Sequence, residues 1–337
     1  MSFDIAALPQ QFVNGLTLGG MYALIALGYT LVYGILLMIN FAHSEMFMSG
    51  AYFGLLWLNI LGKMSLFSST TVGLILLYVI SILLSMVMTG LLGVLIERFA
   101  YRPLRHAPRL APLISAIGVS LFLQNAALLW VSSRSIPFPV RFPVVQYALA
   151  TDAAGKLQFM VLAARDSVAD RLGEGANAIV QISTLQVMIV VVTLFLLFVL
   201  DTFVSRTKMG KAMRATSQDR EAAGLMGVDI NKVIALTFFI GPALGAVAGI
   251  FSGMYYGNIK YNMGFIPGIK SFTAAVIGGI GNLRGAMLGG FVLGMIEALA
   301  SGFISTEYKD VIAFIILILV LIFRPGGLLG ESVVEKV

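Results

Sequence analysis

Long apolar runs separated by short polar segments make up most of this chain. The charge-free stretches are Ile5–Ser44, Met64–Ile96, Leu110–Ser133, Gly175–Leu200, Val233–Ile259 and Val311–Phe323. Most of them exceed the roughly 20 residues that a membrane-spanning helix needs. Backbone amides in hydrocarbon must pair within their own segment, and the runs lack the alternation of barrel strands. The pattern therefore predicts an all-α fold, a polytopic transmembrane helical bundle formed by a single transmembrane domain, residues 1–337.

Eight or nine membrane segments are predicted from these runs. Their bounds are Phe12–Met38, Met46–Gly62, Thr71–Ile96, Ala111–Ser132, Thr184–Phe203, Val233–Tyr256, Ser271–Leu283, Gly285–Ile304 and Val311–Phe323. The piece 271–283 is short for a full crossing, so it can instead be a broken or re-entrant helix beside eight crossings. The count therefore stays open between these two values.

The composition is that of a membrane protein and argues against a nucleic-acid-binding protein. Hydrophobic residues make up 59% of the chain, charged residues 11%, and the mean hydropathy is +0.96. A formal charge of +6 could suggest a nucleic-acid partner, but the basic residues are spread over short loops between spans. Charges in such loops set membrane topology. We therefore expect the lipid bilayer as a partner and no nucleic acid.

Basic residues crowd two of the loops and predict the orientation of the chain. The residues are Arg98, Arg102, Arg105 and Arg109 in one loop, and Arg206, Lys208, Lys211, Arg214, Arg220 and Lys232 in the other. Positively charged loops remain in the cytoplasm, so both loops are predicted inside, together with the C-terminal tail. The N-terminus, with Asp4 and no basic residue before Lys63, is predicted outside.

Residues 133–183 are predicted to form an extracytoplasmic loop or small lobe. Pro137, Pro139 and Pro143 precede a mixed-charge run from Lys156 to Glu174, which is typical of water-exposed chain. The length and charge balance suit contact with a partner in the outer compartment. They suit a merely solvated loop equally well.

Two regions combine polar residues with glycine at membrane depth and predict broken helices along a translocation pathway. The candidate pathway residues are Asn40, His43, Ser44 and Glu45 near the start, and Gly279, Gly281 and Asn282 near the end. A pair of interrupted apolar segments in the two halves of a transporter indicates its central pathway. Each candidate also has a structural alternative. Glu45 can cap the second span, His43 can be a satisfied interfacial histidine, and the glycines can serve close helix packing.

The segment 204–232 is a basic, hydrophilic stretch between two apolar runs. Its apolar positions are Met209, Ala212 and Met213 and, after a break at 217–219, Ala222, Leu225 and Met226. The spacing predicts two short amphipathic helices whose apolar stripes lie in a partner's groove while basic residues contact acidic rims. An ordinary cytoplasmic loop lying on the lipid headgroups fits the periodicity as well.

Several blocks of sequence resemble the LivH branch of branched-chain amino-acid ABC permeases. They lie at Gly15–Tyr52, Thr207–Val228, Ala274–Gly290 and Phe323–Gly330, in the order of that family. Glu221, Ala222 and Ala223, followed by Gly227, resemble the EAA loop with which ABC importer permeases dock on an ATPase. The sequence departs from the fuller loop pattern downstream, where Pro242 is displaced, and the 133–183 loop is longer and more charged than in the family.

The resemblance implies an ATP-driven importer in a bacterial inner membrane. It implies a second, homologous permease, two cytoplasmic ABC ATPase subunits, and a periplasmic substrate-binding protein that delivers branched-chain amino acids. The implied ATPase-coupling residues are Lys208, Lys211, Arg214, Arg220, Glu221, Ala222, Ala223 and Gly227. The sequence contains no G-x-x-x-x-G-K-[ST] motif, so we expect no cofactor in this chain and ATP-Mg handled by the partners.

An enzyme is not expected, because the sequence lacks the parts of a catalytic or metal site. Cysteine is absent and the two histidines, His43 and His106, lie in separate segments. The same ABC architecture could carry urea, short amides or other amino acids. A rival from another class is a proton-coupled secondary transporter or channel with His43, Glu45 and Glu297 as a relay, which would need no docking segment.

Overall fold

The computed structural model describes most of the chain. The described residues are 7–68, 70–105, 107–108, 110–141, 144–151, 156–163, 168–172, 177–324 and 326–330. His106, Arg109, Pro143 and Glu174, which figure in the predictions above, lie outside these residues, as does the tail after 330.

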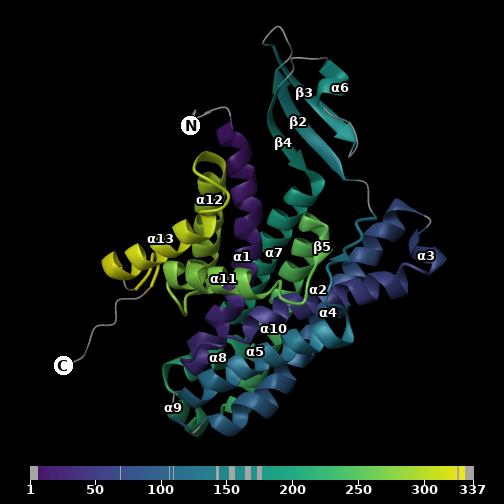
Figure 1. Cartoon of the computed structure of the whole chain (residues 1–337). Coiled ribbons are helices and arrows are strands. Elements are labelled where there is room, and N and C mark those ends of the chain that lie inside the picture. The colour runs from purple at the N-terminus through teal and green to yellow at the C-terminus, as the bar shows by residue number, and fades with distance from the viewer. Residues whose placement is uncertain are drawn as a thin grey trace.

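Each of the nine predicted membrane segments corresponds to a helix (Figure 1). These helices are α1 (Leu8–Leu36), α2 (His43–Leu61), α4 (Thr71–Ile96), α5 (Leu110–Trp130), α7 (Thr184–Arg206), α10 (Ile230–Tyr256), α11 (Phe265–Gly278), α12 (Leu283–Phe303) and α13 (Lys309–Phe323). Six helical stretches of the described chain, those of α1, α4, α5, α7, α10 and α12, are long and apolar enough to cross a membrane. The predicted polytopic helical fold is confirmed.

Shorter elements join these helices. They are α3 (Ser65–Ser68), a π-helical turn η2 (Glu97–Tyr101), a 3-10 turn η3 (Arg102–Leu104), α6 (Val168–Leu172), α8 (Lys208–Gln218) and α9 (Arg220–Leu225). The predicted short segment is α11, whose 14 residues span only about 21 Å at 1.5 Å per residue. The break that follows α11 contains Gly279 and Gly281, both with positive φ. Glycine is required there because other residues rarely adopt that conformation.

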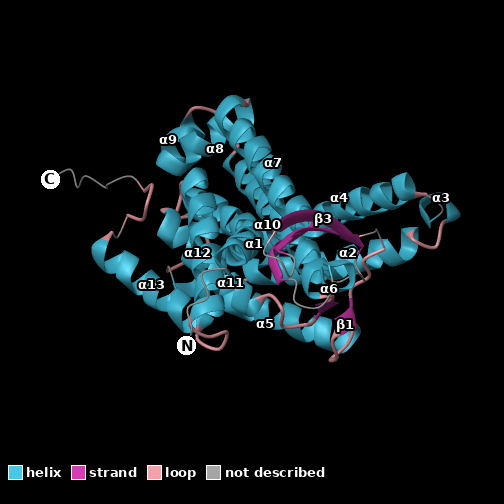
Figure 2. Ribbon diagram, turned by 90° about the horizontal axis from the view of Figure 1, so that it is seen from above, coloured by secondary structure: helices cyan, strands magenta, loops and turns pink. Residues whose placement is uncertain are grey.

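Helix α1 is the centre of the bundle, with 83% of its most apolar window buried. It packs antiparallel against α12, where glycines replace side chains along the contact. A Cβ atom on Gly19 would lie 2.7 Å from Cα of Phe291, and one on Gly294 would lie 2.2 Å from the backbone nitrogen of Gly19. Seen from above, α11, α12 and α13 lie on one side of α1, and α2 and α4 lie on the other (Figure 2).

Helices α2 and α10 also approach backbone to backbone. A Cβ on Gly50 would lie 2.2 Å from Cα of Ala246, and a Cβ on Gly249 would lie 2.0 Å from the carbonyl oxygen of Phe47. Small residues at such crossings let helices pack closely in membranes, where no hydrophobic force drives association. The small residues thus hold α1, α2, α10 and α12 together as the core.

A small antiparallel sheet adds strands to the predicted all-helical bundle. Its strands, in the order β3-β2-β4, are β2 (Val145–Thr151), β3 (Leu157–Ala163) and β4 (Asn177–Ser183), and a separate pair joins β1 (Ile136–Pro137) to β5 (Asn258–Ile259). The sheet stands on the N-terminus of α7, which Ser183 caps with Gln186 in a capping box. Part of the predicted loop is therefore a folded lobe, fixed to the first turn of α7.

Candidate functional site

The segment after α7 consists of two short helices, as its periodicity predicts. Side chains cap the starts of α8, α9 and the following α10: Thr207 accepts a hydrogen bond from the amide of Gly210, Asp219 from that of Ala222, and Asp229 from that of Lys232. Each satisfies an amide that a helix N-terminus leaves without a partner. The N-cap at Asp219 separates α8 from α9.

The apolar stripe of α8 faces its own bundle. Met213 is 2% exposed, and Met209 and Ala212 pack against the main hydrophobic core. The prediction that this stripe lies in a partner's groove is wrong. The spacing correctly predicts an amphipathic helix, but periodicity alone does not say which surface the apolar face covers.

Two of the basic residues in this segment also bind their own chain. Arg214 donates to the backbone carbonyls of Val204 and Ser205 near the end of α7. Arg220 donates from Nε and Nη2 to the carbonyl of Ile35 at the end of α1, at 3.1 and 2.5 Å. A cation is favoured at a helix C-terminus, where carbonyls lack partners. These guanidinium groups therefore brace α8 and α9 against α7 and α1 and do not reach outward to acidic rims.

Helix α9 carries the outward-facing part of the segment. Leu225 is 89% exposed and Met226 is 84% exposed, whereas Ala223 is buried. Lys208, Lys211, Glu221, Ala222 and Gly227 are also exposed. Gly227 has φ 85° and open space around it, so its role here is the turn that leads into α10. Two fully exposed apolar side chains beside charged ones are typical of a protein contact surface.

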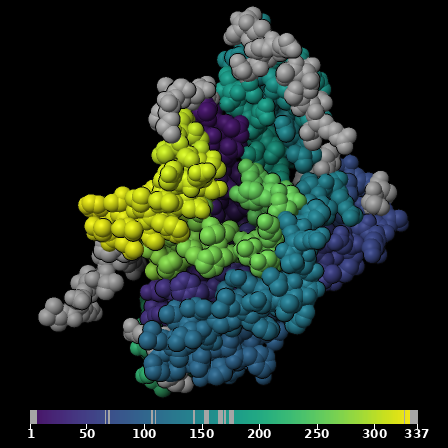
Figure 3. Space-filling model, in the orientation of Figure 1, coloured from purple at the N-terminus to yellow at the C-terminus, as the bar shows by residue number. Residues whose placement is uncertain are grey.

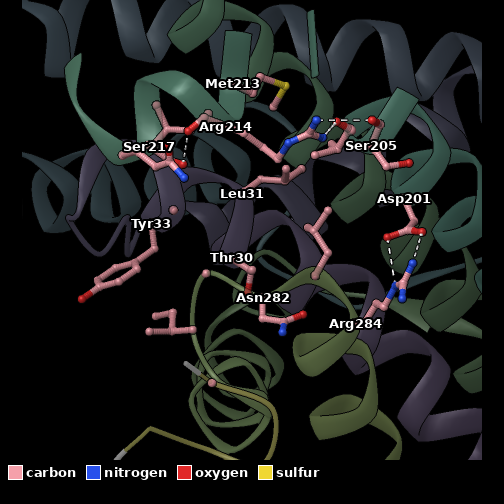
Figure 4. A pocket seen from close by; sticks show the side chains of 18 of the residues that line it. Thr30, Leu31, Tyr33, Asp201, Ser205, Met213, Arg214, Ser217, Asn282 and Arg284 are labelled. Atoms are coloured by element: carbon pink, nitrogen blue, oxygen red, sulfur yellow. Dashed lines mark hydrogen bonds and ion pairs between the residues drawn. The ribbon is translucent and has the colours of Figure 1, made fainter. Parts of the chain in front are cut away.

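A pocket of about 610 Å³ lies between α8 and the adjoining parts of α1, α7 and α12 (Figure 4). Its lining includes Thr30, Tyr33 and Gly34 of α1, Asp201 and Ser205 of α7, Met213, Arg214 and Ser217 of α8, and Ile280 to Arg284 in the break after α11 and the start of α12. Three walls thus come from α1, α7 and the segment 280–284, and one comes from α8. We name it the lower pocket.

An ion pair closes one side of the lower pocket. Arg284 at the start of α12 contacts Asp201 near the end of α7, with Nη2 3.0 Å from Oδ2 (Figure 4). Sequence reasoning did not select these two residues, although opposite charges at the ends of two spans are a signal of such pairing. Of the predicted pathway residues, Gly281 and Asn282 line this pocket. Gly279 instead packs against the backbone of Gly330.

The other four predicted pathway residues are buried between helices and do not line the lower pocket. Asn40 accepts a 2.5 Å hydrogen bond from Tyr101. The imidazole of His43 lies between α1 and α10, edge-on to the ring of Tyr29 with centroids 4.8 Å apart. Both residues therefore lie in the packed turn between α1 and α2, away from the lower pocket.

Glu45 lies in the first turn of α2 and is fully buried. Its Oε1 accepts hydrogen bonds from Gln124 at 2.8 Å and Ser120 at 3.2 Å, both on α5. The adjacent Ser44 meets α11 so closely that a Cβ on Gly268 would lie 2.2 Å from it. The carboxylate thus joins α2 to α5.

The two basic loops lie at the same end of the molecule. Arg105 of the first loop donates to Asn231 at the start of α10, at 2.7 Å, and forms an ion pair with Glu97. No group of three or more His, Cys, Asp or Glu side chains that could hold a metal ion occurs among the described residues. This end of the molecule thus has an exposed apolar surface on α9 and a pocket between helices.

Comparison with known proteins identifies the family. Residues 11–321 match a family model described as a branched-chain amino acid transport system permease component. The chain is 47% identical over 97% of both chains to the high-affinity branched-chain amino acid transport system permease protein BraD of Pseudomonas aeruginosa. It is 44% identical over the full length of both chains to the LivH protein of the same description from Escherichia coli K12.

A weaker likeness covers part of the chain. A probable branched-chain amino acid transport permease protein LivM of Methanocaldococcus jannaschii is 27% identical over 42% of this chain and 46% of its own length. No solved structure matches the chain. Since the family model covers most of the sequence and two relatives are similar over nearly their whole length, the chain belongs to the family of permease components of branched-chain amino acid transport systems.

Proposed function

We propose that this chain is the membrane-spanning permease subunit of an ABC importer that moves branched-chain amino acids into the cell. The observation that carries the proposal is the surface on α9, where Leu225 and Met226 are almost fully exposed beside Glu221. A helix end with this exposed apolar surface needs a partner, and an ATPase subunit is the partner that a chain without a nucleotide motif requires. The full-length likeness to permeases named for branched-chain amino acids supports the cargo.

The coupling path in this proposal runs through two arginines. Closure of a pair of ATPases displaces α9, and Arg220 passes that displacement to the end of α1 through Ile35. Arg214 passes it to the end of α7. Both helices line the lower pocket, so their movement changes how far that pocket opens. Rigid helices that rock around a fixed site are a common means of alternating access.

The proposed orientation places the lower pocket at the cytoplasmic side. Helix α7 has 23 residues, about 34 Å of helix, with the sheet at its N-terminus and α8 at its C-terminus. That length matches the hydrocarbon core of a bilayer, so the sheet and α8 belong on opposite sides of the membrane. Both basic loops lie on the α8 side, which the charge rule assigns to the cytoplasm. The sheet and the start of α1 then face the outer compartment and a binding protein.

The remaining partners follow from the same assignment. The exposed apolar side chains of α4, α5 and α7 suit the lipid of a bacterial inner membrane or a second permease. The partial likeness to a LivM permease, from an organism that also has a LivH protein, supports a homologous second subunit. ATP-Mg would be used by two ATPase subunits, and substrate would arrive on a periplasmic binding protein.

The test is uptake by proteoliposomes that contain this chain with its second permease and ATPases. We expect uptake of leucine, isoleucine and valine that requires ATP and the binding protein, with urea, acetamide and alanine as competitors that define specificity. Glu221→Lys is expected to leave the permease assembled in the membrane but to abolish stimulation of the ATPase. Uptake that needs a proton gradient and persists without ATPase subunits would overturn the proposal in favour of a secondary transporter.

A further inference from the structure

A second pocket contains a cluster of charged side chains inside the helical bundle. This upper pocket, of about 290 Å³, lies between α1, the C-terminal end of α10, α11, α12 and the start of α13. Its lining residues are Tyr22, Ser252, Tyr256, Asn258, Lys260, Asn262, Met263, Ile266, Pro267, Lys270, Glu297, Lys309 and Asp310. Figure 3 shows a recess where purple atoms of α1 are visible between the green and yellow surfaces.

The charges at the base of the pocket form a connected network. Lys270 Nζ lies 2.8 Å from Glu297 Oε1, and both side chains are 3% exposed. The same ammonium lies 2.5 Å from Asp310 Oδ1. Tyr22 donates to the second oxygen of Glu297 at 2.8 Å, and its ring lies 5.8 Å from the Lys270 ammonium. Lys309 approaches Glu297 at 3.8 Å. Four helices therefore contribute to one network of two cations and two anions.

The network lies deep in the membrane-spanning part of the chain. Tyr22 is the central residue of the 29-residue helix α1, so the network lies about 20 Å from either end of that helix. Burying charges at such depth is costly, and replacing a buried ion pair by neutral residues is often neutral or stabilising. Packing alone therefore gives no reason for this cluster.

We propose that the upper pocket is a binding site for the zwitterionic head group of an amino acid on its way through the permease, an inference that rests on the function proposed above. Lys270 binds the carboxylate, and Glu297 and Asp310 bind the ammonium. Because a zwitterion brings one charge of each sign, it can insert into the ion pair without changing the net charge of the site. Met263, Ile266 and Pro267 supply the apolar surface that an aliphatic side chain requires.

The position of the pocket suits a transit site. Its rim contains Tyr256 and Asn258, at the end of α10 that carries the β1–β5 pair, whereas the lower pocket lies behind α8. Tyr22 of the upper pocket and Thr30 of the lower pocket are eight residues apart on α1, about 12 Å along the helix. The two pockets therefore lie at successive levels of the same helix, one toward each face of the bundle.

The test uses protection of a single cysteine from labelling, since the natural sequence contains none. Ile266, which is 44% exposed at the pocket, is changed to cysteine, and the full transporter complex in nanodiscs is treated with a charged thiosulfonate reagent. We expect millimolar L-leucine to slow labelling at residue 266 several-fold. The analogues 3-methylbutylamine and 4-methylpentanoate, which each keep only one of the two charges, are expected not to protect. The control is Val161→Cys in β3, which leucine should not protect.

A double variant tests the ion pair directly. Lys270→Met with Glu297→Gln removes one charge of each sign and keeps an acceptor for the Tyr22 hydroxyl, so the net charge of the site does not change. In the cysteine background it should abolish protection by leucine and lower uptake at least tenfold, while the binding protein still stimulates the ATPase. If this variant does not assemble, Asp310→Asn, whose side chain is 41% exposed, replaces it and should weaken protection.

Each outcome separates the site from the proposed function. A wild-type complex that takes up no amino acid refutes the function. Uptake of leucine without protection of residue 266, or equal protection by the one-charge analogues, refutes the zwitterion site and leaves the function standing. Normal uptake by the Lys270→Met, Glu297→Gln variant assigns the pair a structural role and also refutes the site.

Discussion

The bond between Arg220 and the end of α1 can be broken without disturbing the core. Arg220 lies at the first position of α9, and its guanidinium donates twice to the Ile35 carbonyl. Arg220→Ala removes the hydrogen bonds from α9 to the Ile35 carbonyl of α1, and it leaves the N-cap at Asp219 in place. We expect α9 to remain helical while it detaches more often from the bundle.

The size of the effect follows from the nature of this bond. A hydrogen bond from a charged donor contributes about 1.5 to 3 kcal/mol, and both N–H groups here share one acceptor in a half-buried place. We therefore take the lower bound, about 1.5 kcal/mol. This corresponds to a roughly tenfold increase in the population of detached α9. Arg220→Lys keeps the charge but not the planar guanidinium, so its population of detached α9 should lie between those of the wild type and Arg220→Ala.

Two measurements report this change. Amide hydrogen exchange of the peptide 219–228 in the purified complex should become about tenfold faster, because exchange follows local opening. The number of ATP molecules hydrolysed per amino acid imported should rise, since the ATPases then move α9 without moving α1. ATP hydrolysis in the absence of binding protein should not fall, because the nucleotide sites lie on other subunits.

Lys232→Ala is the matched control. Lys232 is a cation at the start of α10 that pairs with Asp229, at 3.2 Å, and its side chain is 76% exposed. Such exposed pairs contribute little, so neither exchange nor coupling should change. If Arg220→Ala leaves both quantities at wild-type values, or if Lys232→Ala changes them equally, the bracing role of Arg220 is wrong.

Three further predictions concern other parts of the chain. Leu225→Asp should leave the melting temperature of the isolated permease unchanged but abolish co-purification of the ATPase, because this side chain is 89% exposed. Gly249→Val should prevent assembly, since its Cβ would lie 2.0 Å from the Phe47 carbonyl, whereas Gly118→Ala, with nothing within 4 Å, should be tolerated. Asp229 has a pKa below 3.8 because the amide of Lys232 and its ammonium bind the carboxylate. Its contribution to stability is therefore present above pH 3.8 and lost as pH falls through the lowered pKa, so melting curves of Asp229→Ala and wild type should converge only in that acidic range.

Much of the fold could be predicted because each membrane helix is encoded locally. An apolar run of sufficient length forms a helix in lipid whatever its neighbours are, and the predicted bounds of α4 coincide with those observed. The break between α8 and α9 was also predictable, because polar residues at 217–219 interrupt the apolar spacing and Asp219 can cap a helix. The sheet was not predicted, because its short strands lie in a polar segment whose charges indicated only exposure to water.

The sites were less predictable because they depend on contacts between distant segments. The predicted span begins at Ser271 and leaves out Lys270, yet the structure places Lys270 inside α11 and buries it against Glu297 of the next helix. Nothing in the local sequence distinguishes a charge at an interface from a charge paired inside a bundle. In the same way, Arg214 and Arg220 looked like contacts for a partner, and only the fold brings them to the ends of α7 and α1.

The burial of α1 has a consequence for how the protein is made. Among the six spanning stretches α1 has the lowest hydropathy, 1.5 against 2.8 for α7, yet it is the most buried. Its main partner α12 begins 275 residues after the start of α1. At 5 to 20 residues per second, ribosomes need roughly 15 to 55 s to reach that partner. Until α12 is made, α1 is a weakly hydrophobic helix whose glycine face has no partner, so the insertion machinery must keep it in the membrane. Substitutions in α1 should therefore affect biogenesis as well as transport.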